Sequence, residues 1–209
     1  MKLDKRMSAI YSEIPACKNL ADIGADHGYI SINYAINNAN SLVFASDISA
    51  KSVEKAKCTA AKYNLLNYKT TVGDGLEPIK DFDIDVVLIS GMGGEEIIKI
   101  LENSKIYSLY ILSPQKNADK VRKFLSEKDL CPIKDYKVLS ESKFYDIIVC
   151  TSGVYKPTEF ELNFGKGEGD DFKLFSSLTI RNLKELLKVA NDKAKDALLH
   201  KLQLLEGAK

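Results

Sequence analysis

Short apolar, β-branched runs alternate with segments of helical spacing over the first three quarters of the chain. The runs that predict strands are residues 19–23, 42–46, 69–72, 85–90, 107–112, 134–139 and 145–151. Apolar residues recur at helical spacing between the first five runs, as in residues 50–64 and 95–101. This alternation predicts an α/β fold with a seven-stranded, mostly parallel sheet and helices on both faces.

Two of the runs indicate where the sheet has its centre and its edge. Residues 85–90 are apolar at successive positions, which is typical of a central strand covered on both faces. The last two runs are separated by residues 140–143 alone, without room for a helix. We therefore expect them to form an antiparallel hairpin at one edge of the sheet.

The pattern changes after residue 152. Residues 153–171 are rich in glycine and acidic side chains, which predicts a loop. From about residue 172, leucines and alanines recur every three or four positions, which predicts one long helix or a helix pair with a break near residues 191–192. We expect a main domain over residues 1–155 and a helical, coiled-coil-like region over 156–209. That region either packs on the sheet or on itself, or forms an appendage that contacts a partner.

Composition narrows the class of protein. The 209 residues are 45% hydrophobic and 28% charged, which is typical of a globular chain. No apolar run approaches the length of a membrane span, and the start of the chain lacks the apolar core of a signal peptide. The four cysteines are far apart and there are two histidines, so we expect neither a metal site nor disulfides, and a cytoplasmic location.

Charge is distributed unevenly along the chain. The formal net charge of +1 excludes a generally basic nucleic-acid-binding surface. However, residues 21–114 contain 8 basic and 12 acidic residues, whereas residues 172–209 contain 8 basic and 4 acidic residues. Residues 115–145 also have a basic excess. These two basic segments suit an anionic polymer, although a solvated charged surface is the commoner explanation of such segments.

The first predicted strand ends in a glycine turn that two carboxylates flank. Gly24 and Gly28 allow the backbone to come close to a ligand, but their GxxxG spacing differs from the GxGxxG of dinucleotide-binding proteins. Asp22 and Asp26 would repel a pyrophosphate and would attract an ammonium or sulfonium group. The turn therefore favours S-adenosylmethionine over NAD.

Acidic residues also end the next two predicted strands. Asp47 is positioned to accept hydrogen bonds from both ribose hydroxyls of a nucleoside cofactor, and Ile48 could pack on the face of its adenine. Asp74, between Gly73 and Gly75, can accept from an adenine amino group. Each aspartate alone could be a helix cap or a turn residue. Acidic residues at three successive strand ends together indicate a class I methyltransferase.

The fourth and fifth predicted strands end in residues that could contact a substrate. Gly91, Met92, Gly93 and Gly94 would place nearly bare backbone beside the ligand, and the Asp/Asn-Pro-Pro-aromatic signature of many amino-methyltransferases is absent. The segment after the fifth strand contains Ser113, Gln115, Lys116 and Asn117. The side-chain amides of Gln115 and Asn117 could form hydrogen bonds with base edges, and Lys116 could contact a phosphate. The alternative is that this segment is only a turn followed by the start of a helix.

Five segments in this order resemble one enzyme family: ADIGADHGYI, GDGLEPI, SGMGGEEIIKIL, LSPQKNADKVRKFL and FYDIIV. They are similar to the bacterial tRNA (adenine-N1)-methyltransferases that modify adenine 22, a family usually called TrmK. The resemblance covers about residues 4–152. It implies a Rossmann-like class I methyltransferase domain, S-adenosylmethionine as cofactor, and a helical C-terminal part that contacts tRNA.

The resemblance also implies roles for individual residues. Asp22, Gly24, Asp47, Asp74 and Gly75 would hold the cofactor, and Asp26, His27 and Tyr29 would lie by the reacting base with residues 91–94 beneath it. Asp26 is expected to accept from the adenine amino group, and Tyr29 or Tyr145 to stack on the base. The methylated atom, N1 of adenine, follows from the resemblance alone.

Two other functions remain open at this point. The first is a methyltransferase that acts on a protein amine or a small molecule, for which the sheet would look the same. The second is a non-catalytic RNA-binding module that keeps a methyltransferase fold. For the protein as a whole we expect a monomer or a weak homodimer.

Overall fold

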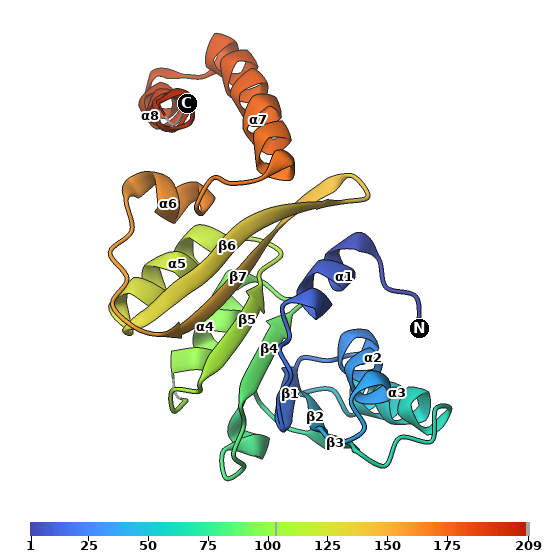
Figure 1. The fold of residues 1–209 in the computed structure, drawn as a ribbon. Coiled ribbons are helices and arrows are strands. Elements are labelled where there is room, and N and C mark those ends of the chain that lie inside the picture. Colours follow the sequence, from blue (N-terminus) through green and yellow to red (C-terminus); the bar gives the residue numbers. More distant parts are fainter. Residues whose placement is uncertain (103, 208–209) are drawn as a thin grey trace.

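The computed structural model describes residues 1–102 and 104–207 and contains one seven-stranded sheet. Its strand order is β3-β2-β1-β4-β5-β7-β6 (Figure 1). The strands are β1 (Asn19–Ile23), β2 (Leu42–Asp47), β3 (Tyr68–Val72), β4 (Val86–Ser90), β5 (Leu109–Ser113), β6 (Leu130–Ser140) and β7 (Lys143–Ser152). Strands β1 to β5 are parallel, and β7 is antiparallel to both β5 and β6. The predicted mostly parallel sheet with an antiparallel hairpin at its edge is confirmed.

Helices cover both faces of the sheet, as the strand–helix alternation predicts. The helices of this domain are α1 (Lys5–Ser12), α2 (Tyr29–Asn37), α3 (Ala50–Ala61), the short 3₁₀ helix η1 (Glu77–Ile79), α4 (Gly94–Glu102) and α5 (Ala118–Glu127). One core joins Val87 and Ile89 of β4 to Ile97 of α4 and Val121 of α5. The other core joins alternate residues of the same strands to α1 and α2. Central strand β4 is therefore apolar on both faces.

Two strand boundaries differ from the predicted ones for local reasons. The predicted run 107–112 begins too early, because the Tyr107 N–H donates to the Tyr110 hydroxyl over 2.8 Å and the chain enters β5 only at Leu109. The predicted run 134–139 begins too late, because β6 already starts at Leu130. Its register shifts between Pro132 and Lys134. Such an irregularity in an edge strand accommodates a proline, which has no N–H to donate.

The predicted loop over residues 153–171 is wrong in part, because helix α6 (Glu159–Phe164) lies within it. The Thr158 hydroxyl accepts from the Glu161 N–H over 3.2 Å, and the Glu161 carboxylate accepts from the Thr158 N–H over 2.7 Å. This reciprocal capping box stabilises the first turn. Phe164 at the end of the helix is 2% exposed, so its burial also favours the helix over a loop.

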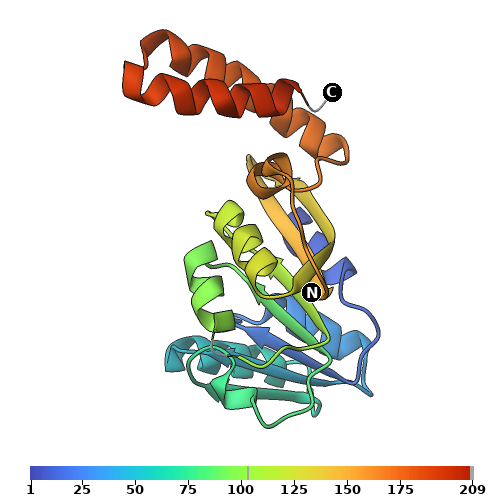
Figure 2. The same ribbon diagram turned by 90° about the vertical axis from the view of Figure 1, so that its left-hand side faces the viewer.

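The predicted helix pair is confirmed as α7 (Asp170–Val189) and α8 (Asp192–Glu206), with the break at the predicted position. Residues 208–209 of the predicted C-terminal region lie outside the described residues. The two helices share an apolar cluster with α6 that includes Phe164, Phe172, Leu183 and Leu202. Figures 1 and 2 show α7 and α8 projecting from the β6–β7 edge of the sheet. The start of α7 packs on this hairpin, where the Phe144 and Phe175 rings lie 5.4 Å apart and Asp171 accepts from the Leu139 N–H over 2.9 Å. The pair therefore packs on itself, on α6 and on the hairpin.

A buried arginine connects the sheet edge to α6. The Arg122 guanidinium donates to Asp135 of β6 over 2.7 and 2.8 Å and to Asp146 of β7 over 2.6 Å. It also reaches the Leu162 carbonyl of α6 over 3.4 Å. Asp146 accepts in addition from Lys137 Nζ over 2.6 Å. Because Arg122 is completely buried, this network fixes α5, the hairpin and α6 relative to one another.

Candidate active site

Four strand tips surround a cavity of ≈ 410 Å³ at the carboxyl edge of the sheet, which we call the first cavity. Its walls come from the ends of β1, β2, β3 and β4 and from one side of α4. The lining residues are Ile23, Gly24, Asp26, Ser46, Asp47, Ile48, Gly73, Asp74, Gly75, Ser90, Gly91, Met92, Glu96, Lys99 and Ile100. A hollow at the carboxyl ends of parallel strands is where ligands bind in open α/β sheets.

A second cavity of ≈ 250 Å³ adjoins the first one. Helix α1, the β1–α2 turn and the start of the β5–α5 loop supply its walls. The lining residues are Arg6, Met7, Asp22, Gly24, Ala25, Asp26, His27, Tyr29, Ile30, Ser90, Gly91 and Gln115. The two cavities share Gly24, Asp26, Ser90 and Gly91. A ligand atom bound in one cavity can therefore contact a ligand atom bound in the other at the boundary that these four residues form.

The β1–α2 turn has a left-handed backbone at alternate positions. Gly24 has φ +72°, Asp26 +43° and Gly28 +68°. The Gly24 N–H donates to the Ser46 carbonyl over 2.8 Å, which holds the turn against β2. The left-handed backbone at position 24 favours glycine, and a Cβ there would displace the end of the Met92 side chain from the β4–α4 loop.

Asp47 combines a structural role with a half-buried position in the wall of the first cavity. One of its oxygens accepts from the Ser49 N–H over 2.8 Å, and the other accepts from the Asp26 N–H over 3.2 Å. Asp47 therefore does stabilise the turn that follows β2, as one of the two alternatives from the sequence predicted. Each carboxylate oxygen has a further lone pair, so Asp47 can still accept from ligand hydroxyls.

Asp22 is the buried carboxylate of the site. It is 4% exposed and lines the second cavity. Burial raises the pKa of Asp22 to about 6, a hydrogen bond with Ser31 opposes this increase, and the charge of Asp47 adds to it. A buried carboxylate with a raised pKa favours a cationic ligand, because the cation would compensate for the lost hydration.

Asp26 is an exposed carboxylate where the two cavities meet. Its Oδ1 accepts from Lys55 Nζ of α3 over 3.1 Å, and His27 Nε2 lies 3.6 Å from its other oxygen. Partial burial acts to raise the pKa of Asp26, but hydrogen bonds with Lys55 and Ser52 and the charges of His27 and Lys55 outweigh it and lower the pKa below its ordinary value. Asp26 is therefore ionised at neutral pH, and it is suited to accept a hydrogen bond.

His27 and Tyr29 form an aromatic wall of the second cavity. Their rings are nearly parallel, with an angle of 5° and centroids 5.1 Å apart. Tyr29 is 40% exposed, so part of its surface is free to contact another planar group. Such surfaces stack on nucleobases that have left a helix.

Most of the predicted cofactor residues are brought together in one place. The first cavity is lined by Gly24, Asp26, Asp47, Ile48, Gly73, Asp74, Gly75, Gly91 and Met92. Asp22 differs, because it lines the second cavity instead. The three predicted catalytic residues Asp26, His27 and Tyr29 all line the second cavity, and Gln115 lies with them.

The remaining predicted substrate residues lie outside both cavities. Gly93, Gly94, Ser113, Lys116, Asn117 and Tyr145 are absent from the two linings. Gly94 serves packing, because its N–H donates to the Lys116 carbonyl over 2.9 Å and a Cβ would collide with the Asn117 backbone. Asn117 donates to the Glu95 carboxylate over 3.4 Å, and Ser113 is completely buried. Their proposed contacts with a substrate stay predictions.

Sequence reasoning missed residues of both cavities. Ser46 precedes Asp47 at the end of β2, and Ser90 is the last residue of β4, so their places at strand ends could have indicated both. Lys99 and Ile100 face the first cavity from the α4 helix, one turn beyond the glycine run. Arg6 lines the second cavity from α1, and no local signal in the sequence connects it to the strand tips.

The side chains that line the two cavities fit S-adenosylmethionine. Asp47 and Asp74 provide acceptors for hydroxyl and amino groups, and Ile48 and Met92 provide apolar surface in the same cavity. The open left-handed position of Gly91, where a Cβ would meet nothing within 4 Å, leaves room beside the backbone between the two cavities. Ionised Asp26 lies where a positively charged group would pass from one cavity to the other.

Other classes of site find little support in the part of the chain that the structure covers. No group of three or more His, Cys, Asp or Glu side chains there is arranged to hold a metal ion. Cys17, Cys58, Cys131 and Cys150 are free thiols. Within residues 1–102 and 104–207, no helix is both long and apolar enough to cross a bilayer.

Comparison with known proteins gives consistent matches. A family model described as "Methyltransferase domain" matches residues 3–148. The tRNA (adenine(22)-N(1))-methyltransferase of Bacillus subtilis is 32% identical over 158 residues, which are 73% of this chain and 66% of that protein. The chain thus aligns with just under two thirds of the length of that curated relative.

Solved structures match over nearly the whole chain. The crystal structure of the B. subtilis m1A22 tRNA methyltransferase TrmK has a TM-score of 0.85 and 25% identity, and the match covers 99% of this chain and 98% of that one. The structure of Mycoplasma capricolum TrmK with S-adenosylhomocysteine has a TM-score of 0.89, 23% identity, and coverage of 99% and 97%. The second likeness shows a shared fold, which includes the C-terminal helices.

Proposed function

The chain belongs to the methyltransferase-domain family, and we propose that it transfers a methyl group from S-adenosylmethionine to N1 of an adenine in tRNA, at position 22. The B. subtilis relative supports the choice of tRNA and of this position. We further propose that the protein acts in the cytoplasm, where tRNA is modified, and as a monomer or a weak homodimer.

The observation that carries this proposal is the junction of the two cavities. The first cavity has the acceptors and apolar surface for a nucleoside cofactor, and the second has an aromatic wall and an ionised carboxylate. They meet at Gly24, Asp26, Ser90 and Gly91. Methyl transfer between two bound molecules needs this kind of contact, because the attacking and leaving atoms must lie in line.

The protein's contribution to the chemistry is mainly positioning. When bound, S-adenosylmethionine would supply a methyl group carried on a cationic sulfur. The N1 lone pair of adenine forms the new bond to this methyl group, and the electron pair of the broken carbon–sulfur bond stays on sulfur. N1 of neutral adenine needs no base to deprotonate it, and the product base is cationic. Holding two reactants in line can lower a barrier by roughly 7–11 kcal/mol. Asp26 can accept from the adenine amino group and stabilise the positive charge that develops on the ring.

The second cavity requires an unpaired adenine, because N1 lies on the Watson–Crick edge. The base must leave its stack to bring this edge into the cavity. Tyr29, stacked on His27, provides a surface on which the extruded base can rest. Its position at the start of α2 is fixed by the left-handed Gly28 that precedes it.

The C-terminal helices offer a surface for the rest of the tRNA. Residues 172–209 contain 8 basic and 4 acidic residues, and α7 and α8 project from the β6–β7 edge of the sheet (Figure 2). Several lysines are exposed there, including Lys184, Lys188 and Lys193. A projecting basic arm suits contact with phosphates that lie far from the modified base.

The test is nucleoside analysis of tRNA treated with the full chain. Unmodified tRNA with adenine at position 22 should gain 1-methyladenosine when cofactor is present, and the same tRNA with guanine at position 22 should not. Whole-cell protein and a panel of small amines, incubated with labelled cofactor, provide the comparison. Label in the protein or amine fraction without label in tRNA would contradict the proposal. Cofactor and RNA binding without any transfer would point to the non-catalytic module.

A further inference from the structure

Arg6 is an arginine without a partner at the edge of the active site. Its Nη1 is buried and has no hydrogen-bond acceptor. Among residues 1–102 and 104–207, no carboxylate forms an ion pair with it, whereas the neighbouring Lys5 pairs with Asp171 over 2.9 Å. A buried charged donor without an acceptor destabilises the folded protein, because it has lost its hydrogen bonds to water and has gained none within the protein. Such a group is usually completed by a ligand or by water.

The side chain is nevertheless held in one place. Its guanidinium carbon lies 5.0 Å from the centre of the Tyr145 ring, within the range of a cation–π contact. Tyr145, whose stacking on the substrate base stays a prediction, lies outside the lining of the second cavity and contacts Arg6. The guanidinium is thus oriented by an aromatic surface before any ligand arrives.

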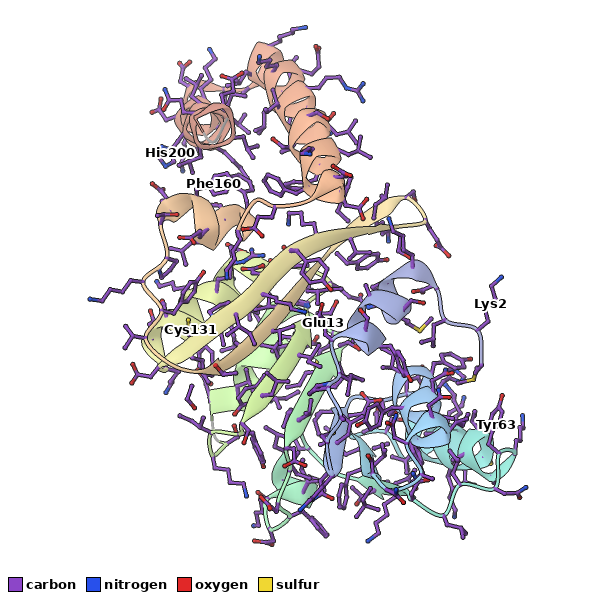
Figure 3. All side chains as sticks on the ribbon, in the orientation of Figure 1. Lys2, Glu13, Tyr63, Cys131, Phe160 and His200 are labelled. Atoms are coloured by element: carbon purple, nitrogen blue, oxygen red, sulfur yellow. The ribbon has the colours of Figure 1, made fainter. Side chains whose placement is uncertain are left out.

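Helix α1, which carries Arg6, is fixed at both ends. Asp4 caps its start by accepting from the Met7 N–H over 2.6 Å. Glu13 at its end accepts from the Tyr136 hydroxyl over 2.8 Å and from Lys134 Nζ over 2.7 Å, both on β6. Ile10 between them is completely buried. Figure 3 shows Glu13 at the base of the hairpin, beside the helix. Arg6 therefore cannot leave the cavity without moving an anchored helix or breaking its contact with Tyr145.

The acidic residues of the second cavity do not neutralise Arg6. Asp26 is bonded to Lys55, and the partner of Asp22 is Ser31. The cavity thus contains two carboxylates that suit a cation and, separately, one guanidinium that suits an oxyanion. A guanidinium binds a planar carboxylate or a phosphate through two parallel N–H donors.

We propose that Arg6 binds an oxyanion of the reactants in the second cavity. This inference rests on the proposed function, which brings two such groups to the site: the carboxylate at the amino-acid end of the cofactor and a phosphate of the target nucleotide. Arg6 is therefore a binding residue that fixes the position of one reactant relative to the other. The shared chemistry is the oxyanion, and its source is decided by experiment.

The first experiment uses inorganic phosphate as the probe and does not depend on methyl transfer. Phosphate should raise the melting temperature of the wild-type chain above that in chloride at equal ionic strength, and Arg6→Met should lose this increase. Lys2→Met is the matched control, because Lys2 is exposed and points away from the molecule (Figure 3). An equal response of wild type and Arg6→Met would overturn the inference, whatever the fate of the proposed function.

The second experiment identifies the source. S-adenosylhomocysteine and 5′-methylthioadenosine, which lacks the amino-acid end, are titrated into each variant by calorimetry. If the carboxylate is the ligand, Arg6→Met should bind the former roughly 10- to 100-fold more weakly and the latter unchanged, since a charge-assisted hydrogen bond is lost. If a phosphate is the ligand, both affinities stay and the KM for tRNA rises by a similar factor, with a smaller salt dependence.

Arg6→Lys separates charge from geometry. It retains the cation without the planar fork and should recover only part of the lost affinity. Unchanged affinity for both nucleosides, together with an unchanged KM, would refute the role of Arg6. If the wild type binds S-adenosylhomocysteine but methylates no tRNA, the proposed function fails while the titrations still test Arg6.

Discussion

Lys55 Nζ lies 3.1 Å from Oδ1 of Asp26 and joins helix α3 to the turn that separates the two cavities. Asp26 has φ +43°, a conformation that aspartate and asparagine tolerate better than most residues. Because the carboxylate is both ionised and held in place, it can act on a developing charge without first reorganising. We regard this pair as the electrostatic centre of the site.

Asp26→Asn should separate binding from chemistry. Asparagine keeps the backbone conformation and removes the charge, so we expect cofactor affinity to change by less than about threefold. The single-turnover rate of methyl transfer should fall by about a hundredfold or more, because the charge that stabilises the cationic product is lost. Rapid-quench measurement at saturating cofactor checks this expectation. A loss of cofactor affinity with unchanged single-turnover chemistry would reverse the assigned role.

The lysine partner provides a companion test. Lys55→Met leaves the Asp26 carboxylate without its main stabilising contact, which should raise the pKa of Asp26 toward or above its ordinary value. Methyl transfer should then decline at a higher pH than in the wild type as the solution is acidified. Lys57→Met on the same helix is the control, since Lys57 pairs with Glu54 over 3.9 Å at the surface. A pH profile that shifts equally in both variants would argue against the pair.

Asp22→Asn should stabilise the fold at neutral pH. Burial raises the pKa of Asp22 to about 6, so the folded state binds a proton more readily than the unfolded state. Ionisation of Asp22 therefore costs stability as the pH rises from about 4 through 6, by roughly 3 kcal/mol in total. Urea unfolding should show the variant more stable at about pH 7.5 and little changed at about pH 4.

The same variant should weaken the binding of reactants, because the buried carboxylate would no longer attract a positive group. A variant that is less stable than the wild type at both pH values would mean that Asp22 has a cationic partner in the folded protein. That result would remove the argument for a ligand cation beside it.

Gly91→Ala should obstruct the junction of the cavities. A methyl group there meets no protein atom within 4 Å and would project into open space. The left-handed backbone, with φ +85°, adds a strain of about 1–2 kcal/mol. We expect cofactor affinity and the rate of transfer each to fall by about tenfold, as measured by calorimetry and single-turnover assay.

Gly169→Ala is a control for the loss of a positive-φ glycine. Gly169 has φ +87° and also has open space at its Cβ position, but it precedes α7, far along the chain from the cavities. Both variants should lose stability in urea, and only Gly91→Ala should lose activity. Equal loss of activity would attribute the effect to strain in general.

Arg122→Met should strongly destabilise the protein. The change leaves Asp135 buried without its two hydrogen bonds and leaves Asp146 with Lys137 alone. Breaking a buried ion pair in this way typically costs about 3–5 kcal/mol. Arg122→Met/Asp135→Asn should recover part of the loss, and Arg181→Met, at an exposed position, should cost almost nothing. Denaturant unfolding of the four proteins gives the comparison.

The strands and the first cavity were predictable because their signals are local. Runs such as residues 85–90 are apolar throughout since both faces are buried, and Asp47 and Asp74 follow directly after strands whose parallel ends must meet. The capping box of Thr158 and Glu161 is a local signal for α6 that the predicted loop overlooked, because glycines and Pro157 surround it.

The second cavity was less predictable because distant segments form it. Arg6 reaches it only because α1 docks on β6 through Glu13 and Lys134, which are separated by 121 positions in the chain. Asp22 faces this cavity and not the first one because side chains alternate along β1, where Ala21 and Ile23 face one core and Leu20 faces the other. That alternation is visible in the sequence, whereas the approach of Arg6 leaves no local pattern.

The boundary between the cavities has a consequence for inhibitor design. Gly24 and Gly91 contribute only main-chain atoms to it, and a larger side chain at either position meets strain or, at Gly24, a collision with Met92. A compound that spans both hollows and bonds to this stretch of backbone would contact atoms that point mutation cannot replace. Mutations that confer resistance to such a compound would have to lie elsewhere in the cavity linings, for example at the exposed Ile48. Those mutations would leave the hydrogen bonds between the compound and the backbone of Gly24 and Gly91 intact.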